Sequence, residues 1–189
     1  MRLLEQRILK EGKAYSEDIL RVDTFINHQV DPELMHKCAR EFASHFRGQG
    51  ITKVVTIESS GISPAVLTAL EMGIPLVILK KQPSKVLNDN LFQTMVTSFT
   101  KGTNYELTLS KDVIGENDHV LIIDDFLANG EAVTGAVRLL RMAHATVAGV
   151  GILIEKSFQP GREKLMDAGF EVYSLARIAS MAKDSITFE

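Results

Sequence analysis

The stretch that decides the fold reads Val120-Leu-Ile-Ile-Asp-Asp-Phe-Leu-Ala-Asn-Gly-Glu-Ala132. Its first four residues are apolar and predict a buried strand that ends at two adjacent carboxylates, Asp124 and Asp125. A short turn with Gly130 then leads into a helix, so the backbone N–H groups of residues 128–132 would converge at a helix N-terminus and bind a phosphate. The carboxylates can accept hydrogen bonds from a sugar diol. The string therefore predicts a site for a ribose 5-phosphate, the alternative being that the aspartates merely cap the turn and the helix.

The rest of the chain alternates between strand and helix around this stretch. Short apolar and β-branched runs predict strands, and Ser63-Pro64 and Pro160 are typical helix starts between them. The predicted strands cover residues 53–57, 76–80, 120–124, 147–155 and 170–175, and the longer helices cover residues 63–73 and about 130–142. Near-continuous apolar strands in such an alternation indicate a parallel sheet that is covered on both faces. The sequence therefore predicts an α/β fold, a single domain over residues 1–189 with a central, mostly parallel sheet flanked by helices.

Two segments depart from this alternation. Near the start, a short helix is expected to end at Gly12, and Asp31-Pro32-Glu33 begins another, because aspartate can cap a helix and proline suits its first position. Further on, residues 82–116 form an interval too long for an ordinary connection. Its runs Phe92–Phe99 and Tyr105–Leu109 alternate like exposed antiparallel strands. Such an excursion is often a lid over a site, and we expect this one to act as a lid.

Composition and charge limit the classes of function. The chain has 189 residues and a net charge of −3, so it lacks the basic surplus expected of a nucleic-acid binder. Its one cysteine, Cys38, lies four residues from both Leu34 and Phe42, which indicates core packing rather than catalysis. The first residues lack the apolar core of a signal peptide, and no apolar run approaches the roughly 20 residues that span a bilayer. We therefore expect a cytoplasmic protein with neither a membrane nor a nucleic acid as partner.

Other polar groups also follow predicted strands, at the edge where ligands bind in open α/β sheets. The loop Ile57-Glu-Ser-Ser-Gly-Ile-Ser-Pro64 has small residues that let backbone amides approach an anion, although it could be an ordinary turn. Lys80 and Lys81 end the next strand, where they could balance an anionic leaving group or simply be solvated. Lys156 follows an apolar strand, where a cation needs a ligand, a carboxylate such as Glu155, or a path to solvent. The sequence has no GxxxxGK[ST], GxSxG or GxGxxG motif, which disfavours triphosphatases, serine hydrolases and dinucleotide-dependent enzymes.

Taken together, these strings resemble the type I phosphoribosyltransferases, which transfer ribose 5-phosphate from phosphoribosyl pyrophosphate (PRPP) to a nucleobase. The resemblance covers roughly Val54 to Glu155, and through Leu20–Pro32 and Ile154–Phe158 it extends to the bacterial members that use xanthine. One feature departs from the wider family, because the phosphate loop lacks the usual threonine or serine hydroxyls. Glu131 would repel a phosphate unless its side chain turned away, so backbone amides should provide most of that contact. The xanthine-using members share this form of the loop.

The resemblance implies a reaction and a set of site residues. PRPP and xanthine would give xanthosine 5′-monophosphate and pyrophosphate, with the new bond at N9 of the purine, and guanine would be a weaker substrate. Asp124 and Asp125 would be the catalytic pair that holds the ribose diol. The remaining contacts would be Ala128, Asn129, Gly130, Glu131 and Ala132 for PRPP, Ser59, Ser60, Gly61 and Lys81 for pyrophosphate, and Leu20, Asn27, Lys156 and Phe158 for xanthine.

The resemblance also implies partners and moving parts. Mg²⁺ would arrive with PRPP and be held mainly by it, without a dedicated metal site in the protein. Residues 1–30 would form a hood over the base, and the chain would form a homodimer. Two alternatives stay open: an enzyme for another base, such as guanine, hypoxanthine, adenine or a pyrimidine, and a regulator that binds PRPP without catalysis. The regulator is disfavoured because it would need an additional DNA-binding domain.

Overall fold

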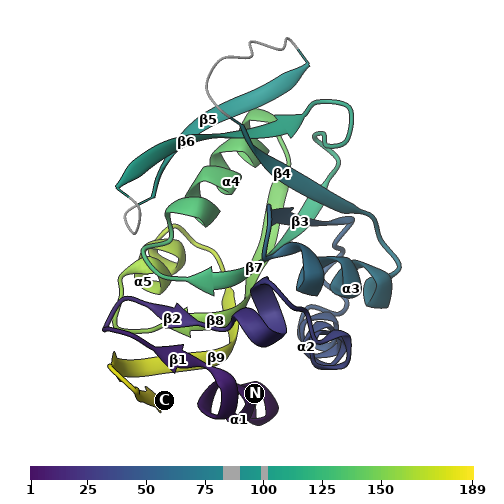
Figure 1. The fold of residues 1–189 in the computed structure, drawn as a ribbon. Coiled ribbons are helices and arrows are strands. Elements are labelled where there is room, and N and C mark those ends of the chain that lie inside the picture. Colours follow the sequence, from purple (N-terminus) through teal and green to yellow (C-terminus); the bar gives the residue numbers. More distant parts are fainter. Residues whose placement is uncertain (83–89, 99–101) are drawn as a thin grey trace.

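The computed structural model describes residues 1–82, 90–98 and 102–189 (Figure 1). Its strands, apart from two short ones near the N-terminus, are β3 (Lys53–Ile57), β4 (Leu76–Gln82), β5 (Leu91–Ser98), β6 (Thr103–Ser110), β7 (His119–Leu127), β8 (Thr146–Lys156), β9 (Val172–Ala182) and β10 (Ser185–Phe188). Within the described residues they form one sheet in the order β10-β9-β8-β7-β3-β4-β6-β5. The strands from β9 to β4 in this order are parallel, whereas β10, β6 and β5 pair antiparallel with their neighbours. The predicted α/β fold with a mostly parallel sheet is confirmed.

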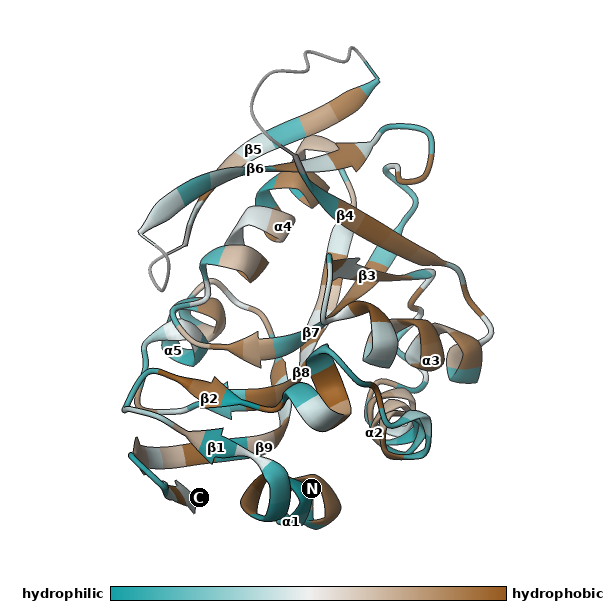
Figure 2. Cartoon of the chain, in the orientation of Figure 1, coloured by the Kyte–Doolittle hydropathy of each residue, from teal (hydrophilic) through white to brown (hydrophobic). Residues whose placement is uncertain are grey.

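Helices cover both faces of this sheet, as continuous apolar strands require. They are α1 (Arg2–Glu11), α2 (Pro32–His45), α3 (Ile62–Met72), α4 (Glu131–Met142) and α5 (Gly161–Asp167). Along β7, Leu121 joins the buried cluster beneath α1, α2 and α3, while its neighbour Ile122 joins the cluster beneath α4 and α5. Cys38 is buried in the first cluster, as predicted. Figure 2 shows long hydrophobic stretches along β4 and α3, which lie in these layers.

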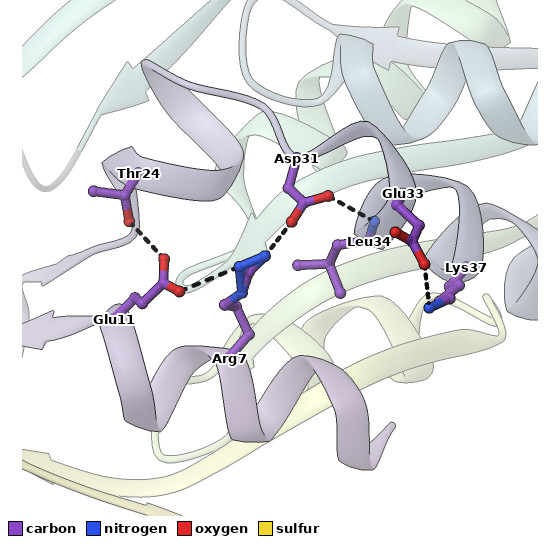
Figure 3. A network of polar contacts seen from close by, with 7 residues as sticks. All are labelled: Arg7, Glu11, Thr24, Asp31, Glu33, Leu34 and Lys37. Carbon is purple, nitrogen blue, oxygen red and sulfur yellow. Dashed lines mark hydrogen bonds and ion pairs between the residues drawn. The ribbon is translucent and has the colours of Figure 1, made fainter.

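The N-terminal segment is fixed to α2 by a network of polar contacts (Figure 3). Asp31 caps α2 by accepting a hydrogen bond from the backbone N–H of Leu34 at 3.0 Å, and it also pairs with the guanidinium group of Arg7 on α1. The hydrogen bonds from Leu34 and Arg7 hold the pKa of the Asp31 carboxyl below its usual value. The Glu11 carboxylate accepts hydrogen bonds from the Arg7 guanidinium group at 3.2 Å and from the Thr24 hydroxyl at 3.4 Å. The helix start predicted at Asp31-Pro32 is thus confirmed, and it also anchors the segment expected to act as a hood.

That segment contains local structure that the sequence did not reveal. Two short strands, β1 (Lys13–Ala14) and β2 (Leu20–Arg21), pair antiparallel in a separate sheet, and a single π-helical turn follows over Asp23–Asn27. Strands of two residues are too short to produce an alternation in the sequence. Phe25 and Ile26 bury this turn against the first core, which holds the segment in place.

The two strands expected in the lid are present, but they are not exposed as predicted. Strands β5 and β6 form an antiparallel hairpin, and Val96 and Leu107 on it are buried in the core beneath α4. Arg138 on α4 fixes the hairpin further by donating to the Met95 carbonyl at 2.6 Å. One face of the β5–β6 hairpin is therefore packed against the core and is not exposed. Residues 83–89 and 99–101, which include the end of the first expected run at Phe99, lie outside the described residues.

The bounds of several strands also differ from the prediction, most of all at β7 and β9. Strand β7 continues to Leu127, because Phe126 and Leu127 pair with Ile154 and Glu155 of β8, so the two aspartates lie within the strand rather than at its end. Strand β9 begins at Val172 and runs to Ala182, well past the predicted end at Leu175, and β10 was not predicted. Pairing with a neighbour lengthens each of these strands, and such pairing is not visible in a single run of sequence. No helix in the described part of the chain is long and apolar enough to cross a membrane.

Candidate active site

The two carboxyls of the acidic pair of β7 differ in exposure, with Asp124 buried and Asp125 half-buried. Asp124 is only 6% exposed, and its Oδ1 accepts the backbone N–H of Asp125 at 2.9 Å. Burial raises the pKa of the Asp124 carboxyl well above its ordinary value, and the adjacent Asp125 charge adds to the effect. Burial likewise raises the pKa of Asp125, although hydrogen bonds oppose it. The charge of Lys81 favours the ionised form of both carboxyls. A buried carboxylate beside a half-buried one is ready to accept hydrogen bonds from a ligand.

The loop after β7 has the geometry of a phosphate site at the start of α4. Gly130 has φ +81°, a left-handed conformation that favours glycine, and its N–H group lies at the helix N-terminus with those of the residues that follow. The loop rests on α5: the Gly161 N–H donates to the Ala128 carbonyl at 2.9 Å, and a Cβ on Gly161 would lie 2.3 Å from that oxygen. Only glycine fits at this contact.

Glu131, the residue expected to repel a phosphate, is paired with a cation. Lys164 of α5 lies 3.0 Å from its Oε1 and also donates to the Asn129 carbonyl at 3.2 Å. The Glu131 side chain is therefore directed toward α5 and its charge is balanced there. This arrangement leaves the backbone amides as the groups that can meet an anion in a loop without hydroxyl side chains.

The loop between β3 and α3 approaches the acidic pair. A Cβ on Gly61 would lie 2.4 Å from Thr56 Oγ1 and 2.8 Å from Asp124 Oδ1, so the loop can come this close only because the residue is glycine. Ser59 is exposed and Ser60 half-buried, and the peptide bond between Glu58 and Ser59 is cis. The structure thus brings the predicted loop between β3 and α3 next to the side chain of Asp124.

The lysines at the end of β4 complete this side of the site. Glu58 accepts the backbone N–H of Lys81 at 2.5 Å and lies 3.3 Å from the ammonium group of Lys80. The Lys81 ammonium group lies 5.1 Å from the centre of the Tyr105 ring on β6. Burial raises the pKa of Tyr105, and the charge of Asp124 raises it further. Lys81 and Tyr105 therefore both interact electrostatically with Asp124. Because Tyr105 lies on β6, this interaction places the β5–β6 hairpin near the acidic pair.

A second group of residues surrounds Lys156 at the end of β8. The side chain is buried, its ammonium group lies 5.9 Å from the centre of the Phe126 ring, and it donates to the backbone carbonyl of Asp18. Gln159 donates to the Asp18 carboxylate at 3.2 Å. Burial lowers the pKa of Lys156, and the Asp18 charge opposes this. Since Phe126 directly follows the acidic pair, Lys156 and the carboxylates lie on neighbouring strands of one site.

Glu155, the alternative partner of Lys156, belongs to a different network. It is fully buried and pairs with Arg162 at 2.7 Å and Arg177 at 3.2 Å. Burial raises the pKa of this carboxyl, but the hydrogen bond from Ser174 and the charge of Arg162 outweigh it, so the net shift is downward. Adjacent residues of a strand point to opposite faces, which separates Glu155 from Lys156.

The other residues expected at the base differ in how deeply they are buried. Leu20 on β2 is half-buried and packs on the first core, Asn27 is exposed at the end of the π-helical turn, and Phe158 is 42% exposed. The aromatic ring beside the Lys156 ammonium group is Phe126, which the sequence analysis included only in the segment between the acidic pair and the phosphate loop. Asp18 was also missed, since a lone aspartate in a polar loop gives no signal that it contacts a residue 138 positions away.

The family described as phosphoribosyl transferase domain matches residues 29–174, a range that contains the acidic pair, both loops and Lys156. The chain belongs to the phosphoribosyltransferase family. Among relatives of this phosphoribosyltransferase, a protein of Agathobacter rectalis named xanthine phosphoribosyltransferase is 64% identical over 188 residues, covering 100% of this chain and 98% of that protein. A Clostridium botulinum protein named xanthine phosphoribosyltransferase 1 is 61% identical, with 100% and 99% covered.

Solved structures of similar fold include adenine phosphoribosyltransferases. The enzyme from Rhodothermus marinus has a TM-score of 0.76 and 22% identity, covering 94% of this phosphoribosyltransferase and 100% of that chain. The enzyme from Saccharomyces cerevisiae has a TM-score of 0.75 and 23% identity, covering 93% and 99%. At such identities the likeness concerns the fold alone, and it agrees with the mostly parallel sheet described above.

Proposed function

We propose that the chain transfers the 5-phosphoribosyl group from PRPP to N9 of xanthine, giving xanthosine 5′-monophosphate and pyrophosphate in purine salvage. The observation that carries this proposal is the identity of 64% and 61%, over essentially the whole chain, to proteins named for that reaction. Guanine is proposed as a weaker substrate. Adenine phosphoribosyltransferases share the fold, but their identity of under a quarter does not support adenine as the base.

For PRPP, we propose that the acidic pair accepts hydrogen bonds from the ribose 2′- and 3′-hydroxyls while residues 128–132 bind the 5-phosphate through their amides. Two features support this: within the described residues neither the buried Asp124 nor the half-buried Asp125 forms an ion pair, and the charge of Glu131 is already balanced by Lys164. Ser59, Ser60, Gly61 and Lys81 would bind the pyrophosphate. The proximity of Gly61 to Asp124 supports a single site for both ends of PRPP.

In the reaction, the bond between C1 of the ribose and the pyrophosphate oxygen breaks, and its electron pair leaves with pyrophosphate. The purine N9 then bonds to C1 and its proton goes to solvent. The protein holds the two substrates in line and excludes water, which are effects of position and electrostatics. The cation of Lys81 near the acidic pair would stabilise the charge of the leaving group.

Mg²⁺ is proposed as the cofactor, carried into the site by PRPP. In residues 1–82, 90–98 and 102–189, no cluster of three or more His, Cys, Asp or Glu side chains is placed to hold a metal ion. The ligands of this ion would come mainly from the hydroxyls and phosphates of PRPP. The ion would neutralise charge on the pyrophosphate when bound.

For the base, we propose that Lys156 donates to the 6-oxo group and that Asn27 donates to the 2-oxo group, with Leu20 as an apolar wall and Phe158 as a ring contact. The burial of Lys156 supports its role, because a buried ammonium group gains from a ligand acceptor.

Residues 1–30 would be the hood. Residues 82–116 would be the lid, and hydrogen exchange of β5 and β6 with and without a PRPP analogue tests it: equal protection would mean an ordinary structural hairpin.

The test of the function is release of pyrophosphate from PRPP and Mg²⁺ with xanthine, hypoxanthine, guanine or adenine as the second substrate. Xanthine should give the highest kcat/KM. The double variant Asp124→Asn and Asp125→Asn should bind PRPP at least tenfold more weakly by calorimetry, since hydrogen bonds to charged groups contribute about 1.5–3 kcal/mol each. Asp167→Asn, an exposed aspartate of α5, is the control. A preference for adenine would refute the proposed base, and unchanged PRPP affinity in a folded double variant would refute the proposed site.

We also propose a cytoplasmic location, which suits a chain whose one cysteine is an unpaired thiol.

A further inference from the structure

Thr56, on the strand beside the acidic pair, has a hydroxyl group without a partner. The residue is 0% exposed, and its Oγ1 makes no hydrogen bond within the part of the chain that the structure describes. Most buried hydroxyls are hydrogen-bonded, because leaving one unpaired in a dry environment is unfavourable. Thr68, the buried threonine of the neighbouring helix α3, follows the rule by donating to the Pro64 carbonyl at 2.8 Å. The Thr56 hydroxyl therefore calls for an explanation that packing alone does not give.

The hydroxyl borders the same small space as a carboxylate oxygen of Asp124. A Cβ placed on Gly61 would lie 2.4 Å from Thr56 Oγ1 and 2.8 Å from Asp124 Oδ1, so both oxygens surround the volume that the glycine leaves open. The two residues come from neighbouring strands, because β3 pairs with β7 in parallel. The donor and the acceptor therefore lie on either side of Gly61, next to the same point in the site.

We propose that Thr56 is a positioning residue for Asp124: when PRPP binds, the Thr56 hydroxyl donates to the Asp124 carboxylate and holds it in the ionised form that accepts the ribose hydroxyls. The inference rests on the proposed role of Asp124 in binding the ribose. It explains why the free hydroxyl is kept beside a buried carboxylate and why Gly61 has no side chain. Gly61 also lies in the loop proposed to bind pyrophosphate. Its proximity to Asp124 places that loop next to the carboxylate proposed to bind the ribose.

The charges around Asp124 give the proposal a pH signature. Among the described residues, the titratable groups that act on it are Asp125 on its own strand, Lys81 on β4 and Tyr105 on β6. Asp125 disfavours the ionised form of Asp124, and Lys81 favours it. A hydroxyl that donates to the carboxylate also favours the ionised form. Without it, Asp124 takes up a proton at higher pH, so PRPP binding should fail earlier as the pH is lowered.

The experiment measures PRPP affinity in the presence of Mg²⁺ by calorimetry between pH 5 and pH 9, with the whole chain. Thr56→Val keeps the shape and removes the donor, Thr56→Ser restores the donor, and Thr68→Val is the matched control. Thr56→Val should bind PRPP roughly three- to tenfold more weakly at neutral pH, with the loss of binding shifted to higher pH. Thr56→Ser and Thr68→Val should follow the wild type in the position of the pH transition.

Two outcomes would overturn the inference, and they are distinct from failure of the proposed site. If Thr56→Val and wild type have the same affinity and pH transition, Thr56 has no part in positioning Asp124. If Thr56→Ser shifts the transition as much as Thr56→Val, the residue acts through packing. Asp124→Asn, measured alongside, tests the site itself: retained PRPP affinity there removes the premise. Circular dichroism checks each fold, and Thr56→Ala replaces Thr56→Val if the valine variant does not fold.

Discussion

Lys156 donates a hydrogen bond from its ammonium group to the backbone carbonyl of Asp18, a residue 138 positions earlier in the chain. The acceptor is a carbonyl oxygen, the same kind of atom that an oxopurine presents at position 6. Gln159 also donates to the carboxylate of Asp18. Two side chains, Lys156 and Gln159, therefore hold the N-terminal segment at the end of β8. In the proposed function, the base takes the place of the Asp18 carbonyl at Lys156. A base without an acceptor at that position leaves the lysine without its ligand.

Replacement of Lys156 should therefore remove the preference for oxopurines. Lys156→Met keeps the length of the side chain and loses the donor, and kcat/KM for xanthine should fall roughly 10- to 100-fold, since a lost partner at a hydrogen-bonding site costs about 1–3 kcal/mol. The rate with adenine, which has an amino group at position 6, should change little. Lys183→Met, at an exposed lysine, is the control. An equal fall for all four bases would assign Lys156 to a step other than base recognition.

Asn27 should determine the choice between xanthine and hypoxanthine. Its amide NH₂ can donate to the 2-oxo group, which hypoxanthine lacks. In Asn27→Ala, the ratio of kcat/KM for xanthine to that for hypoxanthine should fall about tenfold, the effect of one lost hydrogen bond. The amide oxygen of Asn27 could instead accept from the amino group of guanine, so guanine should be a poorer but real substrate. His28→Ala, the exposed neighbour, should preserve the ratio; an unchanged ratio in Asn27→Ala would show that the residue does not read position 2.

Asp124 should reduce the stability of the fold at neutral pH. Its pKa is raised in the folded protein by burial and by Asp125, so the folded state binds the proton more tightly than the unfolded state. Its contribution to stability is therefore lost as the pH rises from its ordinary pKa of 3.8 through the raised value. Asp124→Asn should increase the free energy of unfolding at pH 7, by on the order of 1 kcal/mol, while abolishing PRPP binding.

Urea denaturation of Asp124→Asn and wild type at several pH values measures this difference. Asp31, Asp118 and Glu155 have lowered pKa values and act in the opposite sense, losing stability as the pH falls. The difference between the two proteins isolates Asp124 because those groups are common to both. This difference in the free energy of unfolding should shrink toward zero at low pH. A variant that is less stable than wild type at pH 7 would contradict the expectation.

Gly161 lies outside the phosphate loop of residues 128–132, but the conformation of that loop should depend on it. A Cβ there would be 2.3 Å from the Ala128 carbonyl oxygen and 2.9 Å from the Gly130 nitrogen, both of them rigid backbone atoms. Gly161→Ala should lower the free energy of unfolding by about 1–3 kcal/mol and weaken PRPP binding, because the loop must shift. Gly115→Ala, where an added Cβ meets nothing within 4 Å, is the matched control. Equal PRPP affinity in both variants would mean that the loop tolerates the displacement.

We expect a homodimer and propose the outer face of α3 as part of its interface. Val66 and Leu70 lie one helical turn apart there and are 48% and 71% exposed. Wild type should sediment as a dimer at micromolar concentration, and Leu70→Glu should shift the mass toward the monomer. Met142→Glu, on α4 and 47% exposed, controls for a surface charge. A monomeric wild type would refute the dimer, and a dimeric Leu70→Glu would place the interface elsewhere.

The sequence by itself determined the alternation of strand and helix, the acidic pair, the glycine turn before α4 and the cap at Asp31. Each of these depends on neighbours within a few residues: apolar runs form buried strands, and a carboxylate three residues before a backbone N–H caps a helix. The same local signals predicted that Asp124, Gly61 and Lys156 would lie near one edge of the sheet, because parallel strands end together, although β7 continues past Asp124 to Leu127.

Only the tertiary structure decided which distant groups meet. The partner of Glu131 comes from α5, that of Lys156 from the loop between β1 and β2, and the carboxylate beside Thr56 from β7, and no spacing along the chain encodes these contacts. Strand β7 runs past its predicted end because β8 pairs with it, and the β5–β6 hairpin is packed on α4 rather than exposed. Pairing and burial are energies of the assembled fold, so they override local propensity where an element meets its neighbour.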